Sequence, residues 1–312
     1  MTAMASKNKI SGGGRGNIDD PQASSILPSV RNSRIVFGSC NSQYYEQPFW
    51  DVIIQRHPTA FVWAGDAVYA DDQAREPWPK KDPSCSPIET SDNKNKKEET
   101  TTSDLISYAT PEYLHELFSK QLEIESYKQL LEEDYGGGRI SIFGAIDDHD
   151  YGINNGDKTF PFRKENGVEF TRFLGLTKES SAMARRAEEG LGVYGVQVYD
   201  FSSSLANPRL LTDEEAGLDP DVTPGTDRSG ASITNQLVAV FVLDIRSNKT
   251  PWTKTFPERY SIDPDGDFLG EDQWRWFEEA IGRSNASVNI VVSGIQVHAP
   301  WFYDSNKVEN WR

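Results

Sequence analysis

The sequence predicts a layered α/β fold from three observations. Short apolar runs that are typical of buried strands recur along the chain, and stretches with apolar residues at helical spacing separate several of them. The first strand, helix and strand follow one another at the spacing of a parallel crossover unit. A chain of 312 residues with 37% hydrophobic residues can also bury a sizeable core. Because further strands follow with helices outside them, the pattern favours layered sheets over an all-parallel barrel.

In the first half of the chain, order is expected to begin at Arg34. Residues 1–32 are rich in Gly, Ser, Asn and Asp and have no hydrophobic period, so they are predicted to be a disordered N-terminal segment. Residues 78–107 form a polar, low-complexity insertion without an apolar face, which indicates a surface loop. The elements expected here are strand 35–37, helix 49–54, strand 59–64, a helix opening at 110–112, helix 124–131 and strand 139–146.

The second half of the chain continues with strands and helices. In the last predicted helix, the spacing directs Trp274, Phe277 and Ile281 inward. Residues 205–232 are a second polar insertion that contains Gly and Pro, so residues 33–312 are interpreted as one domain with two insertions. The elements expected here are helix 162–174, strand 193–199, strand 236–243, helix 273–281 and strand 288–292.

Composition excludes several classes of function. The formal net charge is -16, which argues against non-specific binding to nucleic acid or to anionic membranes, because both need clustered Lys and Arg. No apolar run reaches the length of about 18 residues that a membrane-spanning helix needs. The two cysteines, Cys40 and Cys85, have neither a disulfide framework nor the spacing of a zinc finger. The N-terminus lacks the apolar middle region of a secretory signal, and neither compartment nor oligomeric state is predicted.

Polar residues follow three successive predicted strands. They lie at residues 39–41 (SCN), 65–69 (GDAVY) and 147–150 (DDHD), and Arg246 follows a fourth strand in the same way. In open α/β sheets, ligands bind at the carboxyl ends of strands, where loops project functional groups from a rigid sheet. These positions are therefore the candidate functional site.

Asp66 and Tyr69 are candidate metal ligands. One helical turn could bring the carboxylate and the phenol to the same side, and trivalent iron favours both as hard oxygen donors. A thiolate from Cys40 could complete part of the shell. The alternative is structural: Asp66 caps the next helix and Tyr69 packs beside it.

The run at residues 147–150 places four ionisable side chains directly after a buried strand, where they repel one another unless a cation or partner compensates. Asp148 is interpreted as a ligand, His149 as a general acid and Asp150 as the carboxylate that fixes the imidazole tautomer. The alternative is a solvated turn. The amide oxygens that follow at residues 154–155 suit a calcium-like cation. The other histidines are weaker candidates: His57 and His115 are expected to be surface or packing residues, and His298, which follows a strand, stays open.

Together these motifs resemble the alkaline phosphatase D family of metallophosphoesterases, within the calcineurin-like superfamily. The resemblance runs from about Arg34 to the end of the chain, and the order and spacing of the fragments make it specific. It is carried by residues 37–40 (FGSC), 63–71 (WAGDAVYAD), 147–152 (DDHDYG), 243–246 (LDIR), 269–274 (LGEDQW) and 293–296 (SGIQ).

This resemblance implies a four-layer α/β/β/α fold and a site that combines Fe3+ with Ca2+ and hydrolyses phosphomonoesters or phosphodiesters. Cys40, Asp66 and Tyr69 would hold the iron, with Asp66 bridging to the second metal. Asp148 and Asn154 would face that second metal. Asp148 is preferred over Asp147 because the superfamily places its Asn ligand directly before the catalytic His. The resemblance also suggests a secreted or extracytoplasmic protein.

The implied mechanism is attack of a metal-bound hydroxide on phosphorus, with His149 assisting the departing alkoxide. Arg246 would clamp a phosphate oxygen, or instead form a buried salt bridge with Asp244 or another carboxylate. The later family motif Ser-Gly-Asp-x-His does not occur, so the chain is expected to be a fragment whose metal site is incomplete. Two rival interpretations follow: a non-catalytic metal-binding fragment, and a Cys-His hydrolase with Cys40 as nucleophile and His149 as base.

Overall fold

The computed structural model describes residues 34–71, 108–133, 139–202, 208–224, 236–255, 259–260 and 263–297. All of them belong to the compact unit Arg31–Arg312. The predictions about residues 1–32 and 78–107, and those about Cys85 and His298, lie outside the described residues. Within the described part of the chain, helices and strands are mixed, which confirms the predicted α/β class.

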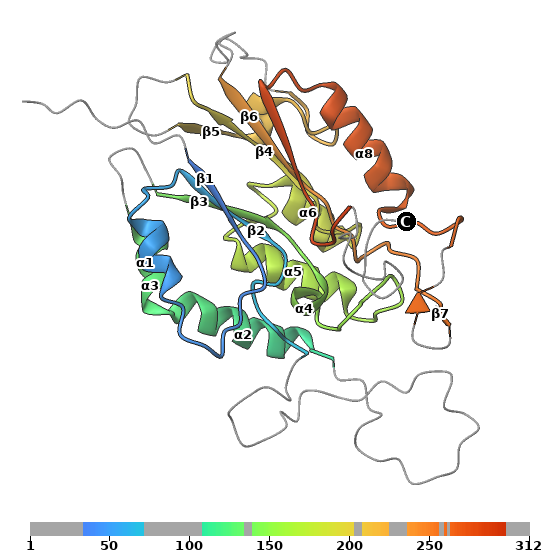
Figure 1. Ribbon diagram of the computed structural model, residues 1–312. Coiled ribbons are helices and arrows are strands. Elements are labelled where there is room, and N and C mark those ends of the chain that lie inside the picture. The colour runs from blue at the N-terminus through green and yellow to red at the C-terminus, as the bar shows by residue number, and fades with distance from the viewer. Residues whose placement is uncertain are drawn as a thin grey trace, which may run out of the picture. The chain divides into compact units, whose positions relative to one another are not determined.

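The first sheet contains three parallel strands in the order β1-β2-β3, which are β1 (Ile35–Gly38), β2 (Ala60–Ala64) and β3 (Ser141–Ala145) (Figure 1). Helix α1 (Phe49–Ile54) connects β1 to β2, so the predicted parallel crossover unit is confirmed. Parallel strands end at the same edge of a sheet. The segments that follow β1, β2 and β3 therefore meet there, as the motifs required.

Helices cover one face of this sheet. Helix α2 (Pro111–Glu123) starts with Pro111 after Thr110, whose side chain accepts a hydrogen bond from the Tyr113 N–H group. Helices α3 (Glu125–Glu132) and α5 (Arg163–Phe173) complete this layer. A buried aromatic cluster joins the helices to β2, with ring centroids 4.6–6.3 Å apart between Trp50, Trp63, Tyr127 and Phe173.

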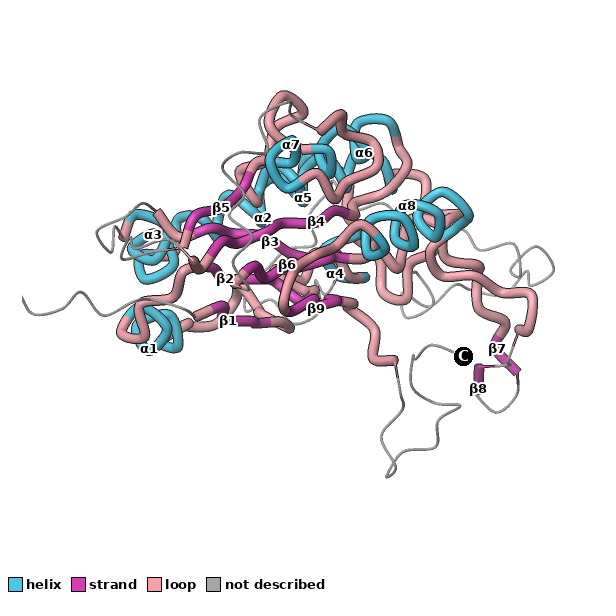
Figure 2. Tube along the Cα trace, turned by 90° about the horizontal axis from the view of Figure 1, so that it is seen from above, coloured by secondary structure: helices cyan, strands magenta, loops and turns pink. Residues whose placement is uncertain are grey.

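The second sheet has the order β5-β4-β6-β9 and contains β4 (Gly195–Asp200), β5 (Arg209–Leu211), β6 (Leu237–Val242) and β9 (Val288–Val292). Strand β4 is antiparallel to both neighbours, whereas β6 and β9 are parallel. Alternate residues of β6 face opposite sides, as the two-residue period of a strand requires. Val240 and Val242 pack in the cluster that includes the first sheet, and Ala239 and Phe241 pack with helix α8 (Gly270–Gly282). Figure 2 shows α8 lying beside the second sheet.

The described part of the second insertion, residues 208–224, contains β5 and helix α7 (Asp213–Ala216), which Thr212 and Glu215 cap reciprocally. One sequence prediction in this region, the inward direction of Trp274, is wrong. Trp274 is 38% exposed, and Trp276 is buried in its place. The reason is that the buried Gln273 side chain bonds the Asp244 backbone, which directs the stripe Gln273, Trp276 and Ala280 inward.

The structure adds elements that the sequence did not predict: α4 (Asp148–Tyr151), α6 (Ala182–Glu189), β7 (Lys254–Thr255) and β8 (Arg259–Tyr260). Among the described residues, no helix has the length and apolar character needed to cross a membrane.

Candidate metal site

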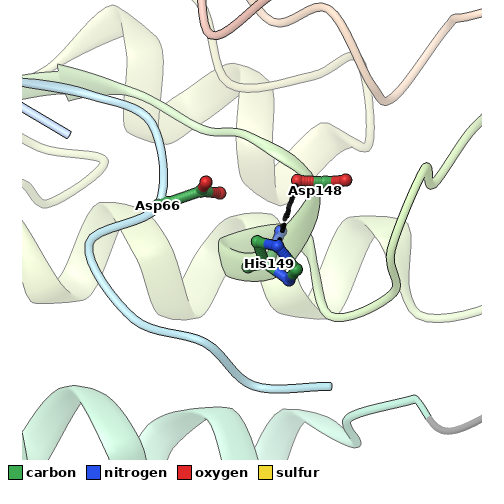
Figure 3. A group of neighbouring side chains, drawn as sticks. All are labelled: Asp66, Asp148 and His149. Atoms are coloured by element: carbon green, nitrogen blue, oxygen red, sulfur yellow. Dashed lines mark hydrogen bonds and ion pairs between the residues drawn. The ribbon is translucent and has the colours of Figure 1, made fainter. Parts of the chain in front are cut away.

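The ends of β2 and β3 bring Asp66, Asp148 and His149 together (Figure 3). Each of the three side chains offers one ligand atom, and these atoms all lie within 4.8 Å of one another. The Asp66 side chain is directed from the segment after β2 toward Asp148 and His149 at the start of α4. Both carboxylates are buried, and His149 is partly exposed. This group could hold a metal ion.

The backbone at the ends of β1 and β2 is unusual. Cys40 and Asp66 have φ angles of 55° and 54°, in the left-handed region that residues other than glycine rarely adopt. Such conformations cost on the order of 1–3 kcal/mol each and cluster at functional sites. Two hydrogen bonds hold them: the Cys40 N–H donates to the Gly65 carbonyl at 3.3 Å, and the Asn41 N–H donates to the Asp66 carbonyl at 2.8 Å.

The negative charge of the Asp66 carboxylate is poorly compensated by the surrounding protein groups. Its buried Oδ1 atom accepts no hydrogen bond from any described residue. Burial, followed by the charges of Asp147 and Asp148, raises the pKa of Asp66 to about 7. A bound cation stabilises a buried carboxylate that lies beside other carboxylates and has an oxygen without a hydrogen-bond partner. The donor set therefore fits a metal.

Cys40 and Tyr69 border the same carboxylate. Cys40 is an exposed residue, but its Sγ atom lies 3.7 Å from the Asp66 Oδ2 atom. Burial and the negative charge of Asp66 raise the pKa of Tyr69 above its usual range, and a hydrogen bond with Cys40 adds to this effect. Gln43 fixes the Tyr69 backbone by accepting from its N–H group at 2.9 Å and donating to its carbonyl at 3.0 Å. The three iron ligands that the resemblance implies therefore lie side by side.

His149 is held by Asp71. Its Nδ1 atom lies 2.5 Å from Asp71 Oδ1, its ring stacks on Tyr69 with centroids 4.1 Å apart, and its Nε2 atom lies 4.0 Å from Asp148 Oδ1. Burial lowers the pKa of His149, but the hydrogen bond and charge of Asp71 outweigh it and raise the pKa to about 9. His149 is therefore protonated at neutral pH and can act as a proton donor.

The role predicted for Asp150 is wrong. Its fully buried carboxylate accepts hydrogen bonds from the Val68 N–H group at 3.1 Å and from the Asp147 N–H group at 3.4 Å. Asp150 stands three residues after Asp147 and forms a capping box with it at the start of α4. It therefore fixes the Asp66 segment to α4, and Asp71 orients His149 instead.

Asp147 belongs to a buried salt bridge. Its Oδ1 atom accepts from Arg246 Nε at 2.7 Å and lies 2.6 Å from Arg246 Nη2, and Arg246 is 1% exposed. Of the two roles open for Arg246, the structure favours the salt bridge. Its nearer partner is Asp147, and its Nη2 atom also lies 3.8 Å from Asp148 Oδ2. Glycine is required on both sides: a Cβ atom at Gly65 or Gly294 would lie 2.6 Å from the Asp147 side chain.

This arrangement favours Asp148 over Asp147 as the ligand, because Arg246 contacts Asp147 at 2.6 Å and Asp148 only at 3.8 Å, and because Asp148 is the carboxylate grouped with Asp66 and His149. The Asp148 Oδ2 atom accepts from the Asn155 N–H group at 2.8 Å, and Asn155 has a left-handed φ of 57°. Asn154 is exposed in the segment after α4. The second-metal role of Asn154 stays a prediction.

Sequence reasoning included Asp71 and Gly294 in the quoted motifs but assigned neither a role in the site. Asp71 lies five residues after Asp66 in the same segment, and this spacing was the available clue. Gly294 follows β9, and only the packing of this segment on Asp147 reveals its role.

No protein-family model, curated protein or solved structure matches this chain.

Proposed function

We propose that this protein is a metal-dependent phosphoric ester hydrolase of the alkaline phosphatase D type, acting on phosphomonoesters or phosphodiesters. One observation carries the proposal. The buried Asp66 carboxylate, whose Oδ1 atom accepts no hydrogen bond from the described residues, lies beside Asp148 and the protonated His149. Hard carboxylate donors suit cations that bind phosphate oxygens, and an adjacent imidazolium suits protonation of a leaving alkoxide.

In this proposal Cys40, Asp66 and Tyr69 would hold Fe3+, and Asp148 and Asn154 would hold Ca2+. When bound, the cations supply Lewis acidity to the phosphoryl oxygens and a nucleophile at neutral pH. The identity of the two metals rests on the family resemblance. The more general proposal, that Asp66, Asp148 and His149 bind a metal ion of whatever identity, rests on the clustering of their three donor atoms.

His149 supplies the proton to the leaving oxygen. Asp71 holds its Nδ1 atom, which leaves the Nε2 atom directed to the side of Asp148. Arg246 contributes a fixed positive charge that favours the ionised form of Asp66, while its guanidinium stays engaged with Asp147. Asp71 and Asp147 are thus positioning residues.

The four-layer α/β/β/α arrangement belongs to the same proposal. It is supported by the two apolar clusters on opposite faces of the second sheet and by the hydrogen bond across the two sheets between the Ser141 and Tyr199 hydroxyl groups, 3.1 Å apart.

The test is hydrolysis of 4-nitrophenyl phosphate and bis(4-nitrophenyl) phosphate by the chain supplied with Fe3+ and Ca2+, with bound metal measured by elemental analysis. Asp66→Ala should abolish both metal retention and hydrolysis. Asp51→Ala, which removes an exposed carboxylate from α1, is the matched control and should change neither.

The rival functions give different results. Metal retention without hydrolysis would favour a non-catalytic metal-binding protein. Hydrolysis that persists in chelator and is lost on thiol alkylation would favour the Cys-His hydrolase. The geometry argues against that last function, because Cys40 contacts Asp66 whereas the Nδ1 atom of His149 contacts Asp71.

A further inference from the structure

A hollow of about 500 Å³ lies beside the candidate metal site. It is formed by the end of β1, the segment at residues 39–47 and the start of α1. Cys40 and Tyr69 belong to its wall. The same two residues border the site, because Cys40 contacts Asp66 and the Tyr69 ring stacks on His149. The hollow and the metal site therefore share a wall.

Aromatic side chains dominate this hollow. Phe37, Tyr45 and Phe49 line it and are 43%, 66% and 43% exposed. Trp50 and Trp63, both fully buried, line it as well. Exposed aromatic rings gathered around a hollow of this size are typical of ligand sites, in which apolar surface binds the ligand and a few polar groups orient it.

The charge of the hollow restricts what it can bind. Its described lining includes Glu46 and contains no lysine or arginine. A second phosphate group needs cationic or N–H donors, so the hollow does not suit a nucleoside polyphosphate or a sugar bisphosphate. It suits an uncharged aromatic or alkyl group, which gains from leaving water and from contact with the rings.

We propose that this hollow binds the apolar, preferably aromatic, leaving group of the phosphoric ester. The inference rests on the proposed function, since the phosphoryl group would lie at Asp66, Asp148 and His149. In hydrolysis, a water oxygen bonds to phosphorus, and the bond between phosphorus and the ester oxygen breaks. The electron pair stays on the ester oxygen, which takes a proton from His149, and the attacking water gives up a proton that restores the imidazolium, directly or through solvent. A phosphomonoester thus gives an aromatic alcohol and inorganic phosphate.

The position of Tyr69 explains why the leaving group would lie on this side. Its ring packs against the His149 imidazole at an interplanar angle of 32° and also forms part of the wall of the hollow. An ester oxygen at His149 would therefore carry its substituent past Tyr69 into the aromatic lining. The substrate class that follows is aryl and long-chain alkyl phosphates.

The first test is direct binding and needs no turnover. Titration of the full chain with 2-naphthol, monitored by isothermal calorimetry, should show saturable binding. Phe49→Ala and Tyr45→Ala should each weaken the binding about three- to tenfold, the range expected for loss of one aromatic contact. Leu210→Ala, which truncates a similarly exposed apolar side chain (41%) on β5, is the control and should have no effect.

The second test compares turnover of 2-naphthyl phosphate and ethyl phosphate by the metal-loaded chain. Phe49→Ala should lower kcat/KM for the naphthyl ester about three- to tenfold and leave that for the ethyl ester unchanged. Equal effects on the two esters, or naphthol binding that neither variant weakens, would overturn the inference. If both esters resist hydrolysis while naphthol binding depends on Phe49, the aromatic specificity of the hollow stands and the proposed hydrolase fails.

Discussion

Replacing Asp71 with Asn should lower the pKa of His149, because the Asp71 carboxylate is what keeps the imidazole protonated. The pKa of His149 is about 9, compared with 6.5 for an ordinary histidine. An opposite charge in direct contact shifts a pKa by about 1–3 units, and burial remains to lower it. In Asp71→Asn we therefore expect the pKa of His149 to fall to between about 6 and 8.

The raised pKa also contributes to stability. The difference between 9 and 6.5 is equivalent to ~3 kcal/mol, and the partial exposure of the His149 side chain reduces this to ~2 kcal/mol. Because the folded-state pKa lies above the unfolded one, this stability is fully present below about pH 6.5 and is lost as pH rises through about 9. Asp71→Asn should flatten that pH dependence in the metal-free protein.

The assay is an NMR titration of the histidine ring protons, which is tractable because the chain has four histidines. The control is Asp51→Asn, which removes an exposed carboxylate and should leave the His149 titration unchanged. Asp150→Asn distinguishes the partner of His149 that the sequence predicted, Asp150, from the partner in the structure, Asp71. If Asp150→Asn lowered the pKa of His149 and Asp71→Asn did not, the assignment of Asp71 as its partner would be refuted.

Three further predictions concern the buried carboxylates Asp66 and Asp147 and the residues that pack on Asp147. Asp66→Asn should raise the free energy of unfolding of the metal-free chain at pH 8 by ~2–4 kcal/mol, because a raised carboxyl pKa destabilises the fold as pH rises from about 4 through about 7. The same variant should lose the increase in Tm on metal addition, and a retained increase would contradict Asp66 as a ligand. Arg246→Leu should lower the free energy of unfolding by ~3–5 kcal/mol in urea titration, because the buried Asp147 carboxylate would lose the guanidinium that pairs with it. A loss below ~1 kcal/mol would show that the bridge is dispensable. Gly294→Ala should cost ~1–3 kcal/mol, because its Cβ atom would lie 2.6 Å from Asp147 Cγ. Gly282→Ala, which has open space around the new Cβ atom, is its control and should be neutral or slightly stabilising.

The strand-end motifs were predictable from the sequence because each combines a short apolar run with an abrupt change to polar residues. The buried strand β2 precedes Asp66, and the buried strand β3 precedes the run at residues 147–150. Parallel pairing of β1, β2 and β3 then brings Cys40, Asp66 and Asp148 to one edge without further information.

The partners of these charges were not predictable, because hydrogen bonding depends on rotamers and on tight turns. Asp150 follows His149 directly in the sequence, yet the first turn of α4 directs the two side chains apart, and the distant Asp71 approaches the imidazole. The inward face of α8 was misjudged for a similar reason. Gln273 is polar, so its burial against Asp244 could not be read from hydrophobic spacing.

The bridge between Asp147 and Arg246 also bears on how the protein reaches its folded state. The two residues are 99 positions apart, and Gly294 packs on the same carboxylate from after the last described strand. Contacts between such distant parts of a chain form slowly, because the intervening chain must first lose conformational entropy. We expect the carboxylates at the end of β3 to stay hydrated until both sheets have formed. An ion captured there should then slow unfolding far more than it accelerates folding, so that metal loading extends the lifetime of the finished protein without guiding its assembly.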